Sequence, residues 1–124
     1  MAHSVIWDVK AFTAHQAAGA AALSTCLHTG EADTNHLMIA YVTAVGVTSE
    51  SSNAWISAAQ FVTDSTPTTT RPFVAINIYR QREDAVWTVA LTTDGTDICI
   101  ELQGDAAEDT EWAVYAFMLQ NHPH

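Results

Sequence analysis

Apolar and polar residues alternate with a period of two along much of the chain, which predicts half-buried β-strands. The alternation runs through residues 4–12, 73–81 and 85–93. In residues 73–81 it places Val74, Ile76 and Ile78 on one side of the expected strand. Such short strands, separated by polar turns, are typical of an all-β protein.

Two further runs, residues 36–47 and 111–120, are apolar at both alternating positions. This pattern is typical of strands that are buried on both faces. Residues 51–63 follow the first run after a polar turn, so the two are expected to form a hairpin. Apolar strand faces that the core does not cover would meet a neighbouring subunit.

The dipeptide Asp94-Gly95 lies between two alternating runs and readily adopts positive φ, which is a strong hairpin signal. The returning strand then places Ile98, Ile100 and Leu102 on one face. The sequence therefore predicts a tight hairpin over this part of the chain.

The Ala-rich residues 15–27 favour a short helix or a packed loop, and residues 63–72 are rich in Thr and contain prolines that block ladder hydrogen bonds. Together the patterns predict an antiparallel β-sandwich of about seven strands, with one short N-terminal helix as an option. No linker or internal repeat divides the chain, so residues 1–124 are expected to form a single β-sandwich domain.

Composition narrows the classes of function. The formal charge is −10, from 4 basic and 14 acidic residues, which repels nucleic acid and anionic membranes. The apolar run near the N-terminus is too short for a membrane span. Cys26 and Cys99 each lie among apolar residues, which favours two buried free thiols over a disulfide bridge.

The sequence of residues 87–117, "WTVALTTDGTDICIELQGDAAEDTEWAVYAF", resembles a β-sandwich module of tailed-bacteriophage virion proteins, of the tail fibre or decoration type. Trp87, the Asp94-Gly95 turn, Gly104 and Trp112 match the rhythm of that module, and the resemblance extends over residues 37 to 119. It implies a structural or host-contact role on a phage particle, in a symmetric oligomer.

No segment carries the motif of a nucleophile elbow, a phosphate-binding loop or a dinucleotide fold. The four carboxylates between residues 105 and 111 could bind calcium, but the EF-hand arrangement is absent, and a solvated acidic strand connection is favoured. We therefore expect no catalytic residue, no cofactor-binding residue and no cofactor, and we predict that the protein is not an enzyme.

His28 and His36 are weak candidates for metal ligands, with Glu31 and Asp33 between them. Two imidazoles and carboxylates can hold a transition metal, but no third histidine completes the set. The favoured expectation is no metal.

Aromatic rings can stack on sugars, and Trp55 is the best candidate for an exposed ring because it follows a polar turn. Asn53 would supply a polar contact beside it. The other tryptophans are expected to pack in the core.

Three functions stay open. The first is a non-enzymatic structural protein of a tailed bacteriophage particle, either a capsid decoration protein or a tail fibre or tail-tip component acting through protein–protein contacts. The second is a lectin-like, carbohydrate-binding adsorption module. The third is a small metal- or ligand-binding protein of the cupin or sandwich type, in which His28 and His36 would converge.

For the first function, the expected partners are other virion proteins of the capsid or tail. A homo-oligomer such as a trimer is expected, with a host-surface glycan as a further candidate partner and with no nucleic acid or membrane. The expected location is the virion, after synthesis in the cytoplasm of a bacterial host.

Overall fold

The computed structural model describes residues 4–83 and 86–122, which form nine strands and no helix. The strands are β1 (Ser4–Gln16), β2 (Leu23–Thr29), β3 (Thr34–Gly46), β4 (Ser52–Thr63), β5 (Thr70–Pro72), β6 (Ile76–Gln81), β7 (Thr88–Asp94), β8 (Asp97–Gln103) and β9 (Thr110–His122). The prediction of an all-β fold is confirmed. Among these residues no helix is long and apolar enough to cross a membrane.

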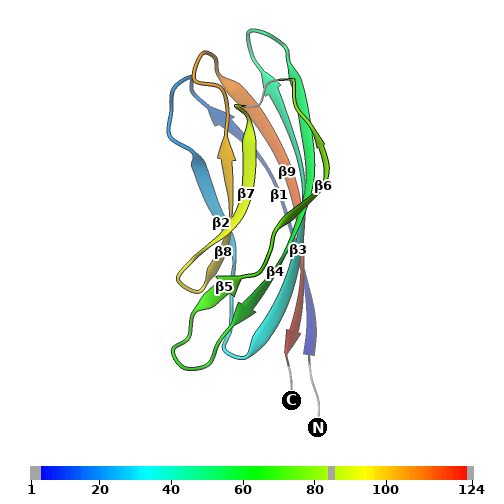
Figure 1. Ribbon diagram of the computed structural model, residues 1–124, viewed down its shortest axis with the longest axis vertical. Coiled ribbons are helices and arrows are strands. Elements are labelled where there is room, and N and C mark those ends of the chain that lie inside the picture. Colours follow the sequence, from blue (N-terminus) through cyan, green and yellow to red (C-terminus); the bar gives the residue numbers. More distant parts are fainter. Residues whose placement is uncertain (1–3, 84–85, 123–124) are drawn as a thin grey trace.

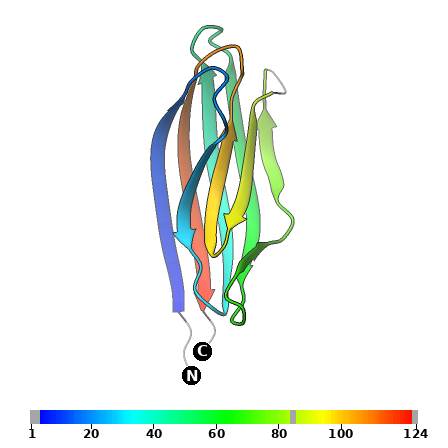
Figure 2. The same cartoon turned by 90° about the vertical axis from the view of Figure 1, so that its left-hand side faces the viewer.

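The strands form two antiparallel sheets that face each other as a sandwich (Figure 1). The six-stranded large sheet has the order β1-β9-β3-β4-β5, and β6 also pairs with β4 beyond the end of β5. The three-stranded small sheet has the order β2-β8-β7 and lies in front of the large sheet in Figure 2. The long central strand β9 joins β1 to β3, so the two ends of the chain lie side by side.

Two strands were not predicted, and they account for the difference between seven and nine. β2 lies in the segment for which a helix was considered, where Gly19 adopts a φ of +74° within a turn that ends β1 and leads into β2. The alanines before Leu23 form this turn instead of a helix. β5 is a three-residue strand inside the expected loop, and its pairing with β4 is local.

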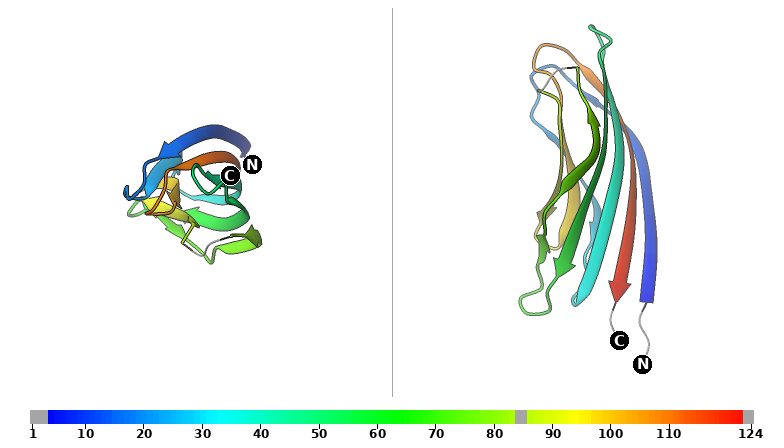
Figure 3. Two further views of the ribbon diagram at one scale, coloured as in Figure 1. Left: turned by 90° about the horizontal axis from the view of Figure 1, so that it is seen from above. Right: turned by 45° about the vertical axis from the view of Figure 1, so that its right-hand side comes forward.

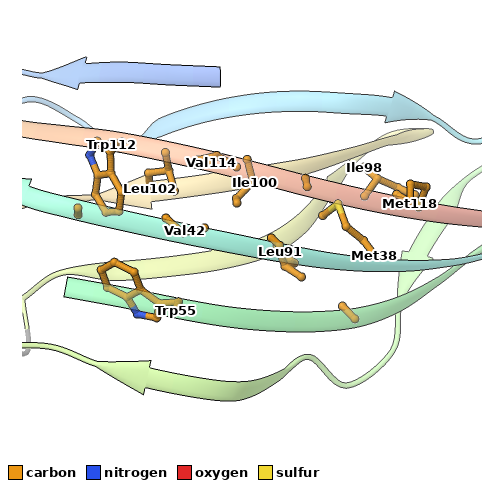
Figure 4. Packing of buried hydrophobic residues seen from close by; sticks show 14 of the residues in the cluster. Met38, Val42, Trp55, Leu91, Ile98, Ile100, Leu102, Trp112, Val114 and Met118 are labelled. Atoms are coloured by element: carbon orange, nitrogen blue, oxygen red, sulfur yellow. The ribbon is translucent and has the colours of Figure 1, made fainter. Parts of the chain in front are cut away.

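The hydrophobic core lies between the two sheets (Figure 4). Met38, Val42 and Trp112 of the large sheet pack against the small-sheet residues Leu91 and Ile100. The Asp94-Gly95 hairpin forms as predicted, with Gly95 at a φ of +62° between β7 and β8. Its tip is held by hydrogen bonds from Gly30 N to Thr96 O and from Thr70 N to Gly95 O.

The expectation that residues 36–47 and 111–120 are buried on both faces is wrong. In β3 and β9 one set of alternating side chains is buried in the core, and most of the other set is exposed or half-buried. The small sheet covers only one face of the large sheet, and no other element of the described chain lies on the opposite face (Figure 3). The second apolar stripe of each strand therefore lies on the surface.

The expectation of two free thiols is also wrong, because Cys26 on β2 and Cys99 on β8 form a disulfide. The two residues are direct partners in the register of the small sheet, and this opposition brings the sulfurs within bonding reach. Cys99 is buried and Cys26 is exposed. Disulfides persist in oxidising surroundings such as the surface of a virion and are rare in a reducing cytoplasm.

Candidate functional site

Many of the exposed large apolar side chains lie on the uncovered face of the large sheet. Its register aligns outward-pointing residues of β1, β9, β3, β4 and β6 into rows that cross the sheet. Its three central rows, each in that strand order, contain Val9, Phe117, Ile39, Ala58 and Ile76; Ala11, Tyr115, Tyr41, Ile56 and Tyr79; and Thr13, Ala113, Thr43, Ala54 and Gln81. We call this set of residues the outer face.

The outer face carries no charged side chain, although the chain has 18 Asp, Glu, Lys and Arg residues in all (4 + 14). Tyr41, Tyr115, Tyr79 and Ile76 are each about half exposed. Large exposed apolar patches on soluble proteins mark interaction sites, whereas single exposed apolar residues carry no such meaning. The arrangement is therefore typical of a surface that another molecule covers.

At the centre of the outer face, two tyrosine rings lie beside a hollow. The rings of Tyr41 and Tyr115 meet edge to face with centroids 6.1 Å apart. Next to them, the small side chains of Thr43, Ala54 and Ala113 form part of a hollow that the tyrosines, with Tyr79, also line. A knob-shaped side chain or a small ring could enter this hollow.

The sequence-predicted sugar contacts do not lie on this surface. Trp55 is only 2% exposed and stacks on Trp112 in the core, so the expectation that its ring is exposed is wrong. Asn53 is buried as well, where its side chain donates a hydrogen bond to Ala44 O and accepts one from Glu83 N. The tyrosines of the outer face are the aromatic side chains that sequence reasoning did not single out.

His28 and His36 do converge, as the metal- or ligand-binding hypothesis required, and their ring centroids lie 5.4 Å apart. His28 Nε2 is hydrogen-bonded to Gln120 Oε1 at 2.5 Å, and His36 Nε2 lies 2.7 Å from Thr34 Oγ1. Among the described residues no group of three or more His, Cys, Asp or Glu side chains is placed to hold a metal ion. The pair instead forms part of a polar network between the sheets.

The acidic connection before β9 stabilises neighbouring loops. Glu108 accepts hydrogen bonds from Ser49 N at 2.9 Å, Ser49 Oγ at 2.7 Å and Thr48 N at 3.0 Å, all in the β3–β4 turn. The hydrogen bonds from the backbone N–H and the hydroxyl group of Ser49 lower the pKa of the Glu108 carboxyl, and the hydrogen bond from Thr48 N adds to this effect. Asp105 accepts from Ala107 N within its own turn.

His15 lies between two further carboxylates at the end of the same connection. Its Nδ1 is 2.5 Å from Glu111 Oε1 and its Nε2 is 3.1 Å from Asp109 Oδ2. The hydrogen bond with Glu111 raises the pKa of His15, and the charges of both carboxylates add to this effect. Asp109 also accepts from Ala18 N, so this exposed cluster ties the β1–β2 turn to β9. The carboxylates thus serve a strand connection, in line with the sequence interpretation.

The fold is similar to parts of two phage tailspike proteins. One is the tailspike protein gp49 of Acinetobacter baumannii bacteriophage Fri1, a capsular polysaccharide depolymerase, with a TM-score of 0.47 and 11% identity over 93% of this chain and 19% of that chain. The other is the Acinetobacter baumannii phage AM24 tailspike protein, with a TM-score of 0.42 and 9% identity over 95% of this chain and 26% of that chain. The chain thus spans about a fifth to a quarter of these neighbours. No protein-family model and no curated protein matches the sequence.

The prediction that the protein is not an enzyme is contradicted by this comparison, since the Fri1 tailspike is a capsular polysaccharide depolymerase. That prediction rested on the lack of known catalytic motifs along the chain, and an enzyme can work without such a local motif.

Proposed function

We propose that the chain is a tail-associated β-sandwich module of a tailed bacteriophage particle, of the tail fibre or tailspike type, which binds a protein partner through its outer face. The observation that carries the binding function is the uncharged apolar outer face, which the small sheet leaves uncovered. The phage context comes from the sequence resemblance of residues 37 to 119 to virion modules.

Two further features support a particle protein. The Cys26–Cys99 disulfide favours a protein that works outside a reducing cytoplasm. The large sheet has strands of up to 13 residues that run the length of the molecule, which presents a long, regular face to a partner. Both features suit an element packed into an assembled tail.

Immunogold electron microscopy of particles from the source lysate tests the location. Label at the tail is the expected result, with phage particles that lack the gene as the unlabelled control. Label spread over the heads would instead identify a capsid decoration protein, and particles without any label would refute the phage assignment.

A second candidate function is glycan binding, and the hollow of the outer face favours it. Tyr41, Tyr79 and Tyr115 line the hollow, and Thr43 supplies a hydroxyl group there. Aromatic rings beside hydroxyl groups are suited to the apolar and polar sides of a sugar. Glycan-array binding by the purified chain that is lost in a Thr43→Val, Tyr79→Ala variant would establish this function.

A further inference from the structure

We propose that the hollow of the outer face binds an arginine side chain, which a basic protein partner inserts beside the tyrosine rings. This inference rests on the proposed function, because it names the chemistry of the partner that the outer face binds. It follows from the placement of the tyrosines, from the charge of the chain and from the lining of the hollow.

The tyrosines of the chain are gathered at one place. The sequence contains three of them, Tyr41, Tyr79 and Tyr115, which lie on the three different strands β3, β6 and β9. All three line the hollow, and each is about half exposed. A single exposed ring carries no meaning, but three rings from distant segments around one hollow indicate a site for a ligand that aromatic rings bind.

Tyrosine rings attract cations, because the face of the ring carries partial negative charge. A cation gains from this contact when it lies within about 6 Å of the ring centroid. The centroids of Tyr41 and Tyr115 are 6.1 Å apart, so one cation can lie within this distance of both rings. The chain makes such a contact elsewhere, since the guanidinium of Arg71 lies 5.3 Å from the ring centroid of Phe73. The hollow offers the same kind of contact to a partner.

The charge of the chain favours a positively charged partner. A formal charge of −10 attracts cations and repels anions. The three central rows of the outer face contain no Lys or Arg, so no cation of these rows competes for the tyrosine rings. Glu111 lies one row beyond Thr43 and Ala113, and its carboxylate, which also contacts His15, places negative charge at the rim of the hollow. A protein with a basic surface is therefore attracted to this face.

The lining of the hollow suits an arginine side chain. Its volume of about 400 Å³ is near the lower end of the range of about 300 to 1,000 Å³ that is typical of ligand pockets. Ala54 and Ala113 can contact the aliphatic part of the side chain, and the hydroxyl group of Thr43 can accept a hydrogen bond from the guanidinium. Arginine is favoured over lysine, because its planar guanidinium is more weakly hydrated and stacks on aromatic rings. Arginine is also enriched among the residues that contribute most to the binding energy of interfaces.

Titration of the intact, oxidised chain with two peptides, followed by nuclear magnetic resonance of the tyrosine ring protons, tests the proposal. The probes are acetyl-Leu-Arg-Leu-amide and the same peptide with citrulline, which replaces the guanidinium by a neutral group of nearly the same shape. Salt at about 150 mM screens attraction that depends on net charge alone. The arginine peptide should shift the ring resonances to saturation and bind about fivefold more tightly than the citrulline peptide, or better.

Variants of one tyrosine separate the role of the ring from that of the hydroxyl group. Tyr41→Leu removes a ring, and its affinity for the arginine peptide should fall about threefold or more, whereas Tyr41→Phe retains the ring and should stay within about twofold of the wild type. Phe73→Leu is the matched control, because it removes an exposed ring outside the hollow and should leave the affinity unchanged. Circular dichroism melting verifies that each variant is folded, and Tyr115→Leu with Tyr115→Phe replaces the Tyr41 pair if either member is not.

Three results would overturn the proposal. The first is that the arginine and citrulline peptides bind equally well or not at all, and the second is that Phe73→Leu abolishes binding and Tyr41→Leu does not. The third is an equal loss in Tyr41→Leu and Tyr41→Phe, which would assign binding to the hydroxyl group, as expected for a glycan. Each of these leaves the proposed function standing if the tail is labelled in the electron micrographs. Arginine binding together with unlabelled particles would refute the phage assignment alone.

Discussion

Trp55 on β4 stacks on Trp112 on β9 across the intervening strand β3, with ring centroids 5.7 Å apart and an interplanar angle of 30°. Small residues make room for the pair, since the β3 partner of Trp112 is Ala44. Figure 4 shows both rings among the apolar side chains between the sheets. The contact therefore belongs to the core, and it couples two strands that do not pair with each other.

Replacing Trp55 by Ala should destabilise the fold strongly, because it removes a large ring from a packed core. Substitutions of this kind lower the free energy of unfolding by about 3 to 5 kcal/mol. Urea unfolding followed by far-ultraviolet circular dichroism measures the loss. Trp55→Phe is the graded control, since it retains a ring and should lower the free energy of unfolding by about half as much. An unchanged midpoint for Trp55→Ala would mean that the ring is not buried.

The wrong expectation that Trp55 is exposed shows what a local sequence pattern cannot predict. Its place after a polar turn suggests exposure, but burial is decided by which strands flank β4 in the sheet and where the small sheet lies. β4 is flanked by β3 on one side and by β5 and β6 on the other, and the small sheet combines β2 with β7 and β8, which lie far from β2 in the chain. No short window of the sequence contains that information.

Other elements could be predicted because their signal is local. The Asp94-Gly95 hairpin is contained in one short segment, from Thr88 to Gln103, and its turn chemistry determines its register. The two-sided apolar pattern of β3 and β9 likewise predicted leftover apolar surface. The disulfide and β2 were missed, because the Cys26 strand pairs only with β8, 73 residues away, and an Ala-rich segment precedes it.

Reducing the Cys26–Cys99 disulfide should destabilise the protein by about 4 kcal/mol. The bond closes a loop of 73 residues, and the estimate is the loop-closure entropy that the unfolded chain regains on reduction. Urea unfolding with and without dithiothreitol measures the difference. The Cys26→Ser, Cys99→Ser double variant is the control, and its midpoint should not respond to the reductant. Equal midpoints for the oxidised and reduced wild-type chain would show that the thiols are not bonded.

The Glu108 carboxylate should make the stability of the fold depend on pH in the acidic range. Its folded pKa is lowered from the ordinary value of 4.5, so its contribution is present above that value and is lost as the pH falls through the lower, folded pKa. Glu108→Gln should therefore melt at a lower temperature than the wild type near pH 7, and the gap should narrow towards pH 3.

The exposed Glu101→Gln on β8 is the charge-matched control for that series. It should follow the wild-type profile except for a general effect of net charge. A Glu108→Gln gap that stays constant from pH 7 to pH 3 would contradict the role of the carboxylate in holding the β3–β4 turn.

The polar side chain of Gln16, at the end of β1, should be important for the stability of the fold. Its side chain is 2% exposed, its Oε1 accepts hydrogen bonds from Gly104 N at 2.8 Å and Trp112 Nε1 at 3.1 Å, and its Nε2 donates to Ala21 O at 2.9 Å. Gln16→Leu leaves these buried groups without partners, and the loss should be about 3 kcal/mol.

The same substitution at Gln103 is the control. Its amide makes longer bonds of 3.2 and 3.5 Å to Gly104 O and Ala20 O and is only part-buried, so Gln103→Leu should lower the free energy of unfolding by less than about 1 kcal/mol. Chemical denaturation of both variants gives the comparison, and indole absorption reports the loss of the Trp112 hydrogen bond. If the two variants are equally stable, the Gln16 amide does not hold the β1 end of the sandwich to β9, and the junction depends on strand pairing alone.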